Sequence, residues 1–272
     1  TFVVTFMLVI GCINGVLGRR CAHKGNIMKE KEINSWQDFI DIVGNHKYRE
    51  WFYRGQSKST WKLESTLFRI IERNIKLRSY GKSKKVTLNR ELYEKEMVDK
   101  FKKSSHLFLE HMPKDDSTYD WLSMMQHYGA PSRMLDFSFS PYVALFFAIS
   151  GIDTKAAVFC IKYSELQKTD EDNYSDIENL RRDAMKQNKK LKKTILIPFE
   201  PQFTNNRLMS QQGAFLIPNT LNFSHNEILD EYENDDFVYK IIIREEIAYQ
   251  LIEKLAQMNI SYTNIYPGLE GF

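Results

Sequence analysis

Three short segments mix apolar residues with Arg, Gln, His and Ser in a way that restricts how this chain folds. They are residues 51–56 (WFYRGQ), 125–138 (MQHYGAPSRMLDFS) and 207–215 (RLMSQQGAF). An unpaired buried polar group costs about 1–3 kcal/mol, so polar side chains within apolar segments need partners or a ligand. We therefore expect the three segments to meet as one polar site on an apolar scaffold.

The composition is that of a globular protein, with 272 residues, 43% of them hydrophobic and 27% charged. A formal net charge of +3 is too small to indicate nucleic acid as a bulk partner. The basic run at residues 73–90 is interpreted as a solvated loop, with contact to nucleic acid or another polyanion as the alternative. The cysteines, Cys12, Cys21 and Cys160, lack disulfide-framework spacing, which favours a reducing compartment and a cytoplasmic protein.

The first 27 residues differ from the rest of the chain. Residues 1–17 form an apolar, glycine-containing run that no positive charge precedes, and its unbroken part is shorter than the roughly 20 residues of a membrane helix. We interpret residues 1–27 as an upstream extension or an added tail outside the fold; a weak membrane-associating segment is the alternative. Residues 28–272 are expected to form one domain without membrane contact.

Hydrophobic periodicity predicts both helices and strands in that domain. Helices are expected at 35–43, 89–110, 119–127 and 245–258, and strands at 51–53, 135–139, 156–163, 194–199, 214–218 and 237–244. Arg54 is expected at the carboxyl end of its strand. The charged segment 164–193 is interpreted as a surface excursion. The predicted class is α+β, with helices packed on a mostly antiparallel central sheet.

One further helix has the clearest boundaries in the chain. Ser140 is a favourable N-cap, Pro141 suits the first helical position, and residues 143–149 are almost wholly apolar. We expect this helix to lie deep in the core.

Several common chemistries lack their sequence signatures. The chain has no GxxxxGK[ST] phosphate loop, GxGxxG dinucleotide fingerprint, HExxH pair or CxxC pair. These absences argue against Walker-type NTPases, Rossmann dehydrogenases and standard zinc hydrolases, and we expect no metal site.

The motifs resemble those of the FRG domain family. The resemblance rests on YRGQ at 53–56, QHYGAPSRMLDFS at 126–138, SQQGAF at 210–215 and IYPGLEG at 265–271, and it extends from about residue 36 to 271. The family's function is poorly defined, so this resemblance alone implies no activity.

The order of the motifs is also similar to the Arg, Ser-Thr-Ser, Gln-x-Glu layout of ADP-ribosyltransferases. That resemblance implies an ADP-ribosyltransferase-like fold with NAD as substrate, and a toxin or phage-defence role in bacteria. It implies that Arg54 holds the diphosphate, Ser138 positions the nicotinamide ribose, and Gln211 or Gln212 contacts the ribose hydroxyls. Further ligand contacts are expected from Tyr53, Gln56, Gln126, His127, Tyr128 and Arg133.

The third motif departs from the transferase pattern because Ser210 to Gly213 contain no carboxylate. Transferases of this kind use a Glu there to stabilise positive charge developing at the ribose carbon. A charge pair 4 Å apart is worth about 4 kcal/mol at an effective dielectric constant of 20, or roughly a thousandfold in rate. Asp136, flanked by Leu135 and Phe137, is the preferred substitute, ahead of Glu64.

Three other interpretations remain open. The pocket could be a non-catalytic module that binds a nucleotide or a modified side chain. His127 and Asp136 could be the base and the orienting acid of a metal-independent hydrolase or nuclease. The motifs could also be a buried structural network containing an Arg54–Asp136 ion pair. The sequence does not identify a macromolecular target.

Overall fold

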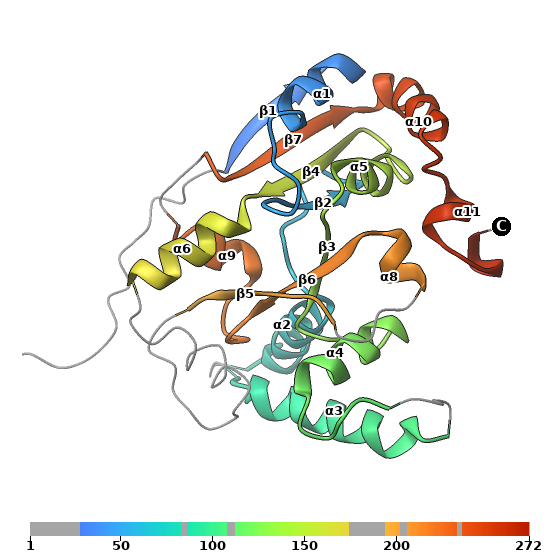
Figure 1. The fold of residues 1–272 in the computed structure, drawn as a ribbon. Helices are drawn as coiled ribbons and strands as arrows, with labels where there is room; N and C mark the ends of the chain where they lie inside the picture. The colour runs from blue at the N-terminus through green and yellow to red at the C-terminus, as the bar shows by residue number, and fades with distance from the viewer. Residues whose placement is uncertain are drawn as a thin grey trace, which may run out of the picture.

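The fold is built on one seven-stranded sheet with strand order β1-β7-β4-β2-β3-β6-β5 (Figure 1). It is seen in a computed structural model that describes residues 28–82, 86–107, 112–173, 194–201, 206–232 and 236–271. The strands are β1 (Lys29–Ile33), β2 (Phe52–Gln56), β3 (Leu135–Ser138), β4 (Lys155–Ile161), β5 (Leu196–Phe199), β6 (Gly213–Pro218) and β7 (Val238–Arg244). β1 and β7 are parallel, and the other neighbouring pairs are antiparallel. The predicted α+β class with a mostly antiparallel sheet is confirmed.

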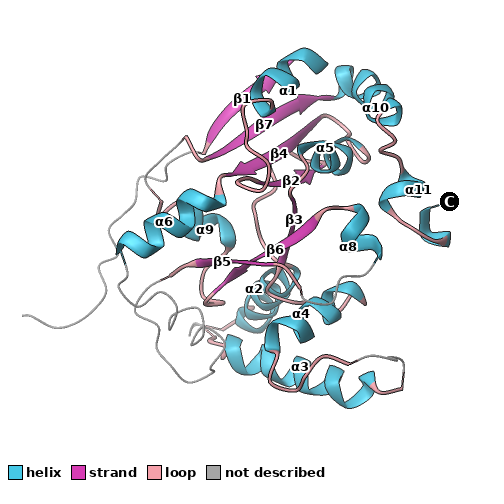
Figure 2. Ribbon diagram, in the orientation of Figure 1, coloured by secondary structure: helices cyan, strands magenta, loops and turns pink. Residues whose placement is uncertain are grey.

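Helices pack against both halves of this sheet (Figure 2). Figure 1 shows α1, α5 and α10 beside the β1–β7–β4–β2 half, and α2, α3 and α4 near the β3–β6–β5 half. The α-helices are α1 (Trp36–Val43), α2 (Thr66–Ser79), α3 (Arg90–Ser105), α4 (Thr118–His127), α5 (Pro141–Ile149), α6 (Tyr163–Asn173), α8 (Asn206–Ser210), α9 (His225–Leu229), α10 (Ala248–Gln257) and α11 (Tyr262–Ile265). Two 3₁₀ turns, η1 (Glu245–Ile247) and η2 (Leu269–Gly271), complete the described elements.

The predicted helix starts at Ser35 and Ser140 are confirmed by their capping contacts. The Ser35 hydroxyl accepts a hydrogen bond from the Asp38 backbone N–H at 3.1 Å. The Ser140 hydroxyl likewise accepts from the Val143 N–H at 3.3 Å, and Pro141 occupies the first turn. Helix α5 is buried along most of its length, as its apolar sequence predicts.

Other predicted boundaries were wrong. Arg54 lies inside β2, because pairing with β4 continues to Gln56. The loop predicted for the basic run is instead helical as far as Ser79, at the end of α2. The helix expected to reach residue 110 ends at Ser105.

Strand β1 was not predicted, because four of its five residues are charged. It forms through pairing with β7, which the local sequence does not reveal.

Two of the segment interpretations fall partly or wholly outside the described residues. Residues 1–27 and 174–193 lie outside them, whereas 163–173 form α6. Within the described residues, every helix is too short or too polar to cross a membrane.

The sheet opens between β2 and β3. Over the described residues these strands share one register pair, Tyr53 with Ser138. Beyond that pair β2 continues along β4, from Phe52 to Gln56, while β3 continues along β6, from Ser138 back to Leu135. The two halves of the sheet therefore diverge beside Arg54.

Gly55 allows α5 to lie directly against β2 at this opening. A Cβ atom on Gly55 would stand 1.9 Å from the Ala144 carbonyl oxygen and 2.6 Å from the Ala148 nitrogen. Backbone atoms of a buried helix have little room to move away. Glycine at this position therefore sets how closely the strand and the helix approach.

We predict that Gly55→Ala destabilises the fold by at least about 1–3 kcal/mol, because the added methyl overlaps the α5 backbone. Gly151→Ala is the matched control, since its Cβ would meet Ser57 Cβ at an ordinary 3.5 Å. Its effect should stay within about 0.5 kcal/mol. Urea unfolding of both variants measures the difference, and equal stabilities would contradict the close approach.

A partly buried hydrogen-bonded array joins β2 to β7 on the α1 side of the sheet. His46 Nδ1 lies 2.7 Å from the Tyr53 hydroxyl, and His46 Nε2 lies 2.6 Å from the Tyr239 hydroxyl. The imidazole also stacks on Trp51 with ring centroids 3.8 Å apart. Burial, with a smaller effect of Lys31, lowers the pKa of His46 to about 4. The imidazole is therefore neutral at pH 7.

This pKa predicts a loss of stability in acid. Between pH 6.5 and 4 the unfolded chain protonates His46 while the folded protein does not, so stability falls as the pH drops through that window. The slope contributed by one histidine is at most about 1.4 kcal/mol per pH unit. His46→Gln keeps one donor and one acceptor but does not titrate. Unfolding free energies of the two proteins from pH 7 to 4 should converge in acid, and parallel curves would contradict the assignment.

Candidate functional site

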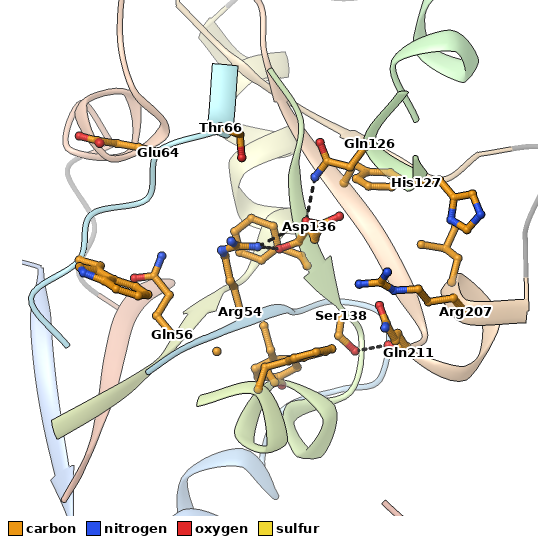
Figure 3. Close-up of a pocket in the computed structure, with 18 of the residues that line it drawn as sticks. Arg54, Gln56, Glu64, Thr66, Gln126, His127, Asp136, Ser138, Arg207 and Gln211 are labelled. Atoms are coloured by element: carbon orange, nitrogen blue, oxygen red, sulfur yellow. Dashed lines mark hydrogen bonds and ion pairs between the residues drawn. The ribbon is translucent and has the colours of Figure 1, made fainter. Parts of the chain in front are cut away.

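The three motifs meet at a cavity of about 680 Å³ in the opening between β2 and β3 (Figure 3). The first motif contributes Arg54 and Gln56, the second Gln126, His127, Asp136 and Ser138, and the third Arg207 and Gln211. The volume lies within the range of about 300–1,000 Å³ typical of small-molecule sites. Segments far apart in sequence thus line one cavity.

Arg54 bridges the two halves of the sheet. Its Nη1 donates a hydrogen bond to the Asp136 backbone carbonyl at 2.6 Å and lies 3.9 Å from Asp136 Oδ2. Its Nε is buried and has no hydrogen-bond partner among the described residues. Burial lowers the pKa of Arg54, and the nearby Asp136 carboxylate partly opposes this effect. A guanidinium nevertheless stays charged at neutral pH. Arg54 therefore places a cation at the cavity wall, with an unused N–H donor buried behind it.

Asp136 is held by a short chain of side-chain hydrogen bonds. The buried Ser132 hydroxyl donates to Gln126 Oε1 at 2.5 Å. Gln126 Nε2 then donates to Asp136 Oδ2 at 2.8 Å. Because Ser132 occupies the amide oxygen of Gln126, the amide nitrogen is directed to Asp136. The Asp136 side chain is still 57% exposed, so its carboxylate is accessible from the cavity.

Ser138 and Gln211 connect the second and third motifs. The Ser138 hydroxyl donates to the Gln211 backbone carbonyl at 2.7 Å and accepts from the Ser140 N–H at 2.9 Å. Gln211 Nε2 donates to the Ile265 carbonyl at 3.2 Å, which brings the C-terminal segment to the same edge. Both side chains line the cavity and also hold its walls together.

His127 lines the cavity from the end of α4, apart from the Arg54–Asp136 contact. In Figure 3 its ring points toward the side where Arg207 lies, and Gln126 is the α4 residue that reaches Asp136. The α4 side chain that hydrogen-bonds to Asp136 is therefore Gln126 and not the neighbouring His127.

Three predicted site residues do not reach the cavity in the way that was expected. Tyr53 lines the cavity, but its hydroxyl reaches His46 on the α1 side. Tyr128 is exposed at the end of α4 and does not line this cavity. Gln212, also outside the lining, has a left-handed φ of 46° and accepts the Phe139 N–H on its carbonyl at 2.9 Å.

Arg133 lies outside the cavity lining in a buried ion pair with Glu94 of α3. Its Nε donates to both carboxylate oxygens of Glu94, at 2.8 and 2.9 Å. Burial alone lowers the pKa of Arg133, but Glu94 outweighs this and raises it overall. The pair connects α3 to the segment that enters β3.

The cavity also contains residues that sequence reasoning did not select. Trp61, Lys62, Thr66 and Arg69 follow the first motif directly, and Arg207 opens the third. Proximity to the motifs was the available signal for them. The lining holds more cations than carboxylates: Arg54, Lys62, Arg69 and Arg207 against Glu64 and Asp136. This balance favours an anionic ligand.

The segment around the first two motifs matches a known family. The FRG domain family matches residues 49–157, which include β2, the Asp136 region and the start of β4. This part of the chain is therefore similar to an FRG domain. The third motif and the closing IYPGLEG lie beyond the matched residues, so the extension of the resemblance to residue 271 stays a prediction.

No curated protein and no solved structure matches the chain. The similarity of the chain to ADP-ribosyltransferases therefore rests on the order of its motifs alone.

Breaking the Arg133–Glu94 pair should destabilise the fold. We predict that Arg133→Met lowers the free energy of unfolding by about 3–5 kcal/mol, because Glu94 becomes an unpaired buried charge. The double variant Arg133→Met/Glu94→Leu should recover most of that loss. Urea unfolding measures the stabilities, and a fully stable Arg133→Met protein would contradict a structural role.

Proposed function

We propose that the cavity binds a nucleotide, NAD or a close relative, and that the protein cleaves the nicotinamide glycosidic bond. The observation that carries this proposal is the convergence of all three motifs on one cavity, with Arg54 at its centre. The ADP-ribose is then transferred to water or to a macromolecular target. A toxin or phage-defence role would suit such an activity.

Arg54 is the proposed diphosphate contact. A phosphate oxygen can accept the unpartnered Arg54 Nε–H, and hydrogen bonds between a guanidinium and an anion are roughly twice as strong as neutral ones. Arg69 and Arg207, which also line the cavity, add positive charge for the same ligand. Metal ions are not needed for this mode of binding.

Asp136 is the proposed substitute for the missing glutamate of the third motif. As the bond between the ribose C1′ and the nicotinamide nitrogen breaks, its electron pair leaves with nicotinamide and positive charge develops on the ribose. A carboxylate about 4 Å away stabilises that charge by about 4 kcal/mol at an effective dielectric constant of 20. An incoming water forms the new C1′–O bond and releases a proton, which completes hydrolysis.

A non-catalytic binding module is the second candidate. The observation in its favour is that Asp136 already engages Gln126 and lies near Arg54, so its charge is partly compensated. Such a module would bind the same nucleotide without turnover. The hydrolase alternative based on His127 and Asp136 has less support, since Gln126 is the residue bonded to Asp136.

The decisive test is nicotinamide release from NAD by the full chain, alongside calorimetric binding. Asp136→Asn should lower the release rate by roughly a thousandfold while NAD still binds, because the variant removes only the charge. Glu64→Gln, which alters the other cavity carboxylate, is the matched control and should retain activity. Arg54→Gln should abolish binding of NAD.

Each outcome separates the candidates. Binding without release by the unaltered protein would favour the binding module. Absence of NAD binding, or full affinity in folded Arg54→Gln, would overturn the proposal.

A further inference from the structure

Strand β2 carries a second buried polar atom without a partner, on a residue that lines the cavity. Gln56 is only 8% exposed, and its Oε1 has no hydrogen-bond partner among the described residues. Arg54 and Gln56 are two positions apart, so they point to the same face of the strand with Cα atoms about 6–7 Å apart. One offers a charged donor through Nε and the other a neutral acceptor. A ligand that satisfies both must carry an acceptor and a separate donor.

The orientation of the Gln56 amide is set by the backbone. Its Nε2 donates to the Lys62 carbonyl at 3.4 Å. The opposite orientation would place two oxygens together, so Oε1 is the atom left for a ligand. A buried acceptor gains most from an N–H or O–H donor.

Trp61 supplies a planar apolar surface at the same end of the cavity. It immediately precedes Lys62, lines the cavity and is 52% exposed. Its loop is held by the Trp61 N–H donating to the Lys58 carbonyl at 3.1 Å and by the Ser59 N–H donating to the Lys155 carbonyl at 2.8 Å. An exposed indole on a fixed loop suits a flat heterocycle, since base–aromatic stacking is worth about 1–3 kcal/mol.

We propose that Gln56 and Trp61 form a base subsite that selects adenine. The adenine ring stacks on Trp61, and its exocyclic amine donates to Gln56 Oε1. This inference rests on the proposed nucleotide function. Figure 3 shows Gln56 and Asp136 on opposite sides of Arg54. A dinucleotide with its diphosphate at Arg54 thus places adenine at Gln56 and its other ribose toward Asp136.

The test compares calorimetric binding of ADP and inosine diphosphate to the full chain. Hypoxanthine carries an oxygen where adenine carries the amine, so it faces Gln56 Oε1 with a second acceptor. The unaltered protein should bind ADP about tenfold or more tightly than inosine diphosphate. In Gln56→Met, which keeps the side-chain length, the two affinities should agree within about twofold.

Trp61→Leu tests the stacking surface independently, and its exposed position makes loss of folding unexpected. It should weaken both nucleotides by about tenfold and keep the preference for ADP. Tyr249→Leu, which alters an exposed aromatic residue outside the cavity, should change neither affinity. Thermal unfolding confirms that each variant is folded. If Gln56→Met does not fold, the unaltered protein and Trp61→Leu decide the question.

The outcomes distinguish this inference from the function on which it rests. Equal affinities for ADP and inosine diphosphate in the unaltered protein would overturn the adenine subsite and leave nucleotide binding intact. An unchanged preference in folded Gln56→Met, or unchanged affinities in Trp61→Leu, would also overturn it. Failure to bind NAD, ADP or inosine diphosphate would overturn both.

Discussion

The hydrogen bond from Arg54 Nη1 to the Asp136 carbonyl joins two strands at the point where their backbone pairing has stopped. A fully paired sheet has no room for a ligand between neighbouring strands, whereas strands that diverge leave space and unpaired backbone groups. Here a side chain satisfies one of those groups and keeps a charged atom at the cavity wall. The opening in the sheet and the candidate site therefore depend on the same arginine.

Two arginines of the motifs, Arg54 and Arg133, differ in burial and in hydrogen bonding, and we infer different roles for them from this difference. The guanidinium of Arg133 donates to both oxygens of the Glu94 carboxylate, and its side chain is 5% exposed. The Arg54 side chain lines the cavity and is 23% exposed, and its buried Nε has no hydrogen-bond partner among the described residues. A saturated buried ion pair contributes specificity to the fold, while an incompletely satisfied donor has binding energy available for a ligand.

Local sequence signals predicted the elements whose stability is local. Helix α5 followed from Ser140, Pro141 and an apolar run, because caps and hydrophobic burial act over a few residues. Strand β1 did not, because its charged sequence becomes a strand only through pairing with β7, about 200 residues later. The end of helix α2 was predicted as a loop because its last two turns are mostly polar. Its first turns bury Leu67, Phe68 and Ile71, and the helix continues from them to Ser79.

By itself the sequence determined the α+β class, the capped core helix, the three polar motifs and the resemblance to the FRG domain family. Tertiary structure decided which motif residues share a cavity. In the folded protein Arg54 and Gln126 both bind Asp136. Arg133 instead forms an ion pair with Glu94, and Gln212 and Tyr128 lie outside the cavity lining. The physical reason is that a sequence motif specifies only the types of residues and their order. Which side chains contact one another depends on the register of the sheet and on the close approach of α5 to Gly55, and long-range contacts set both.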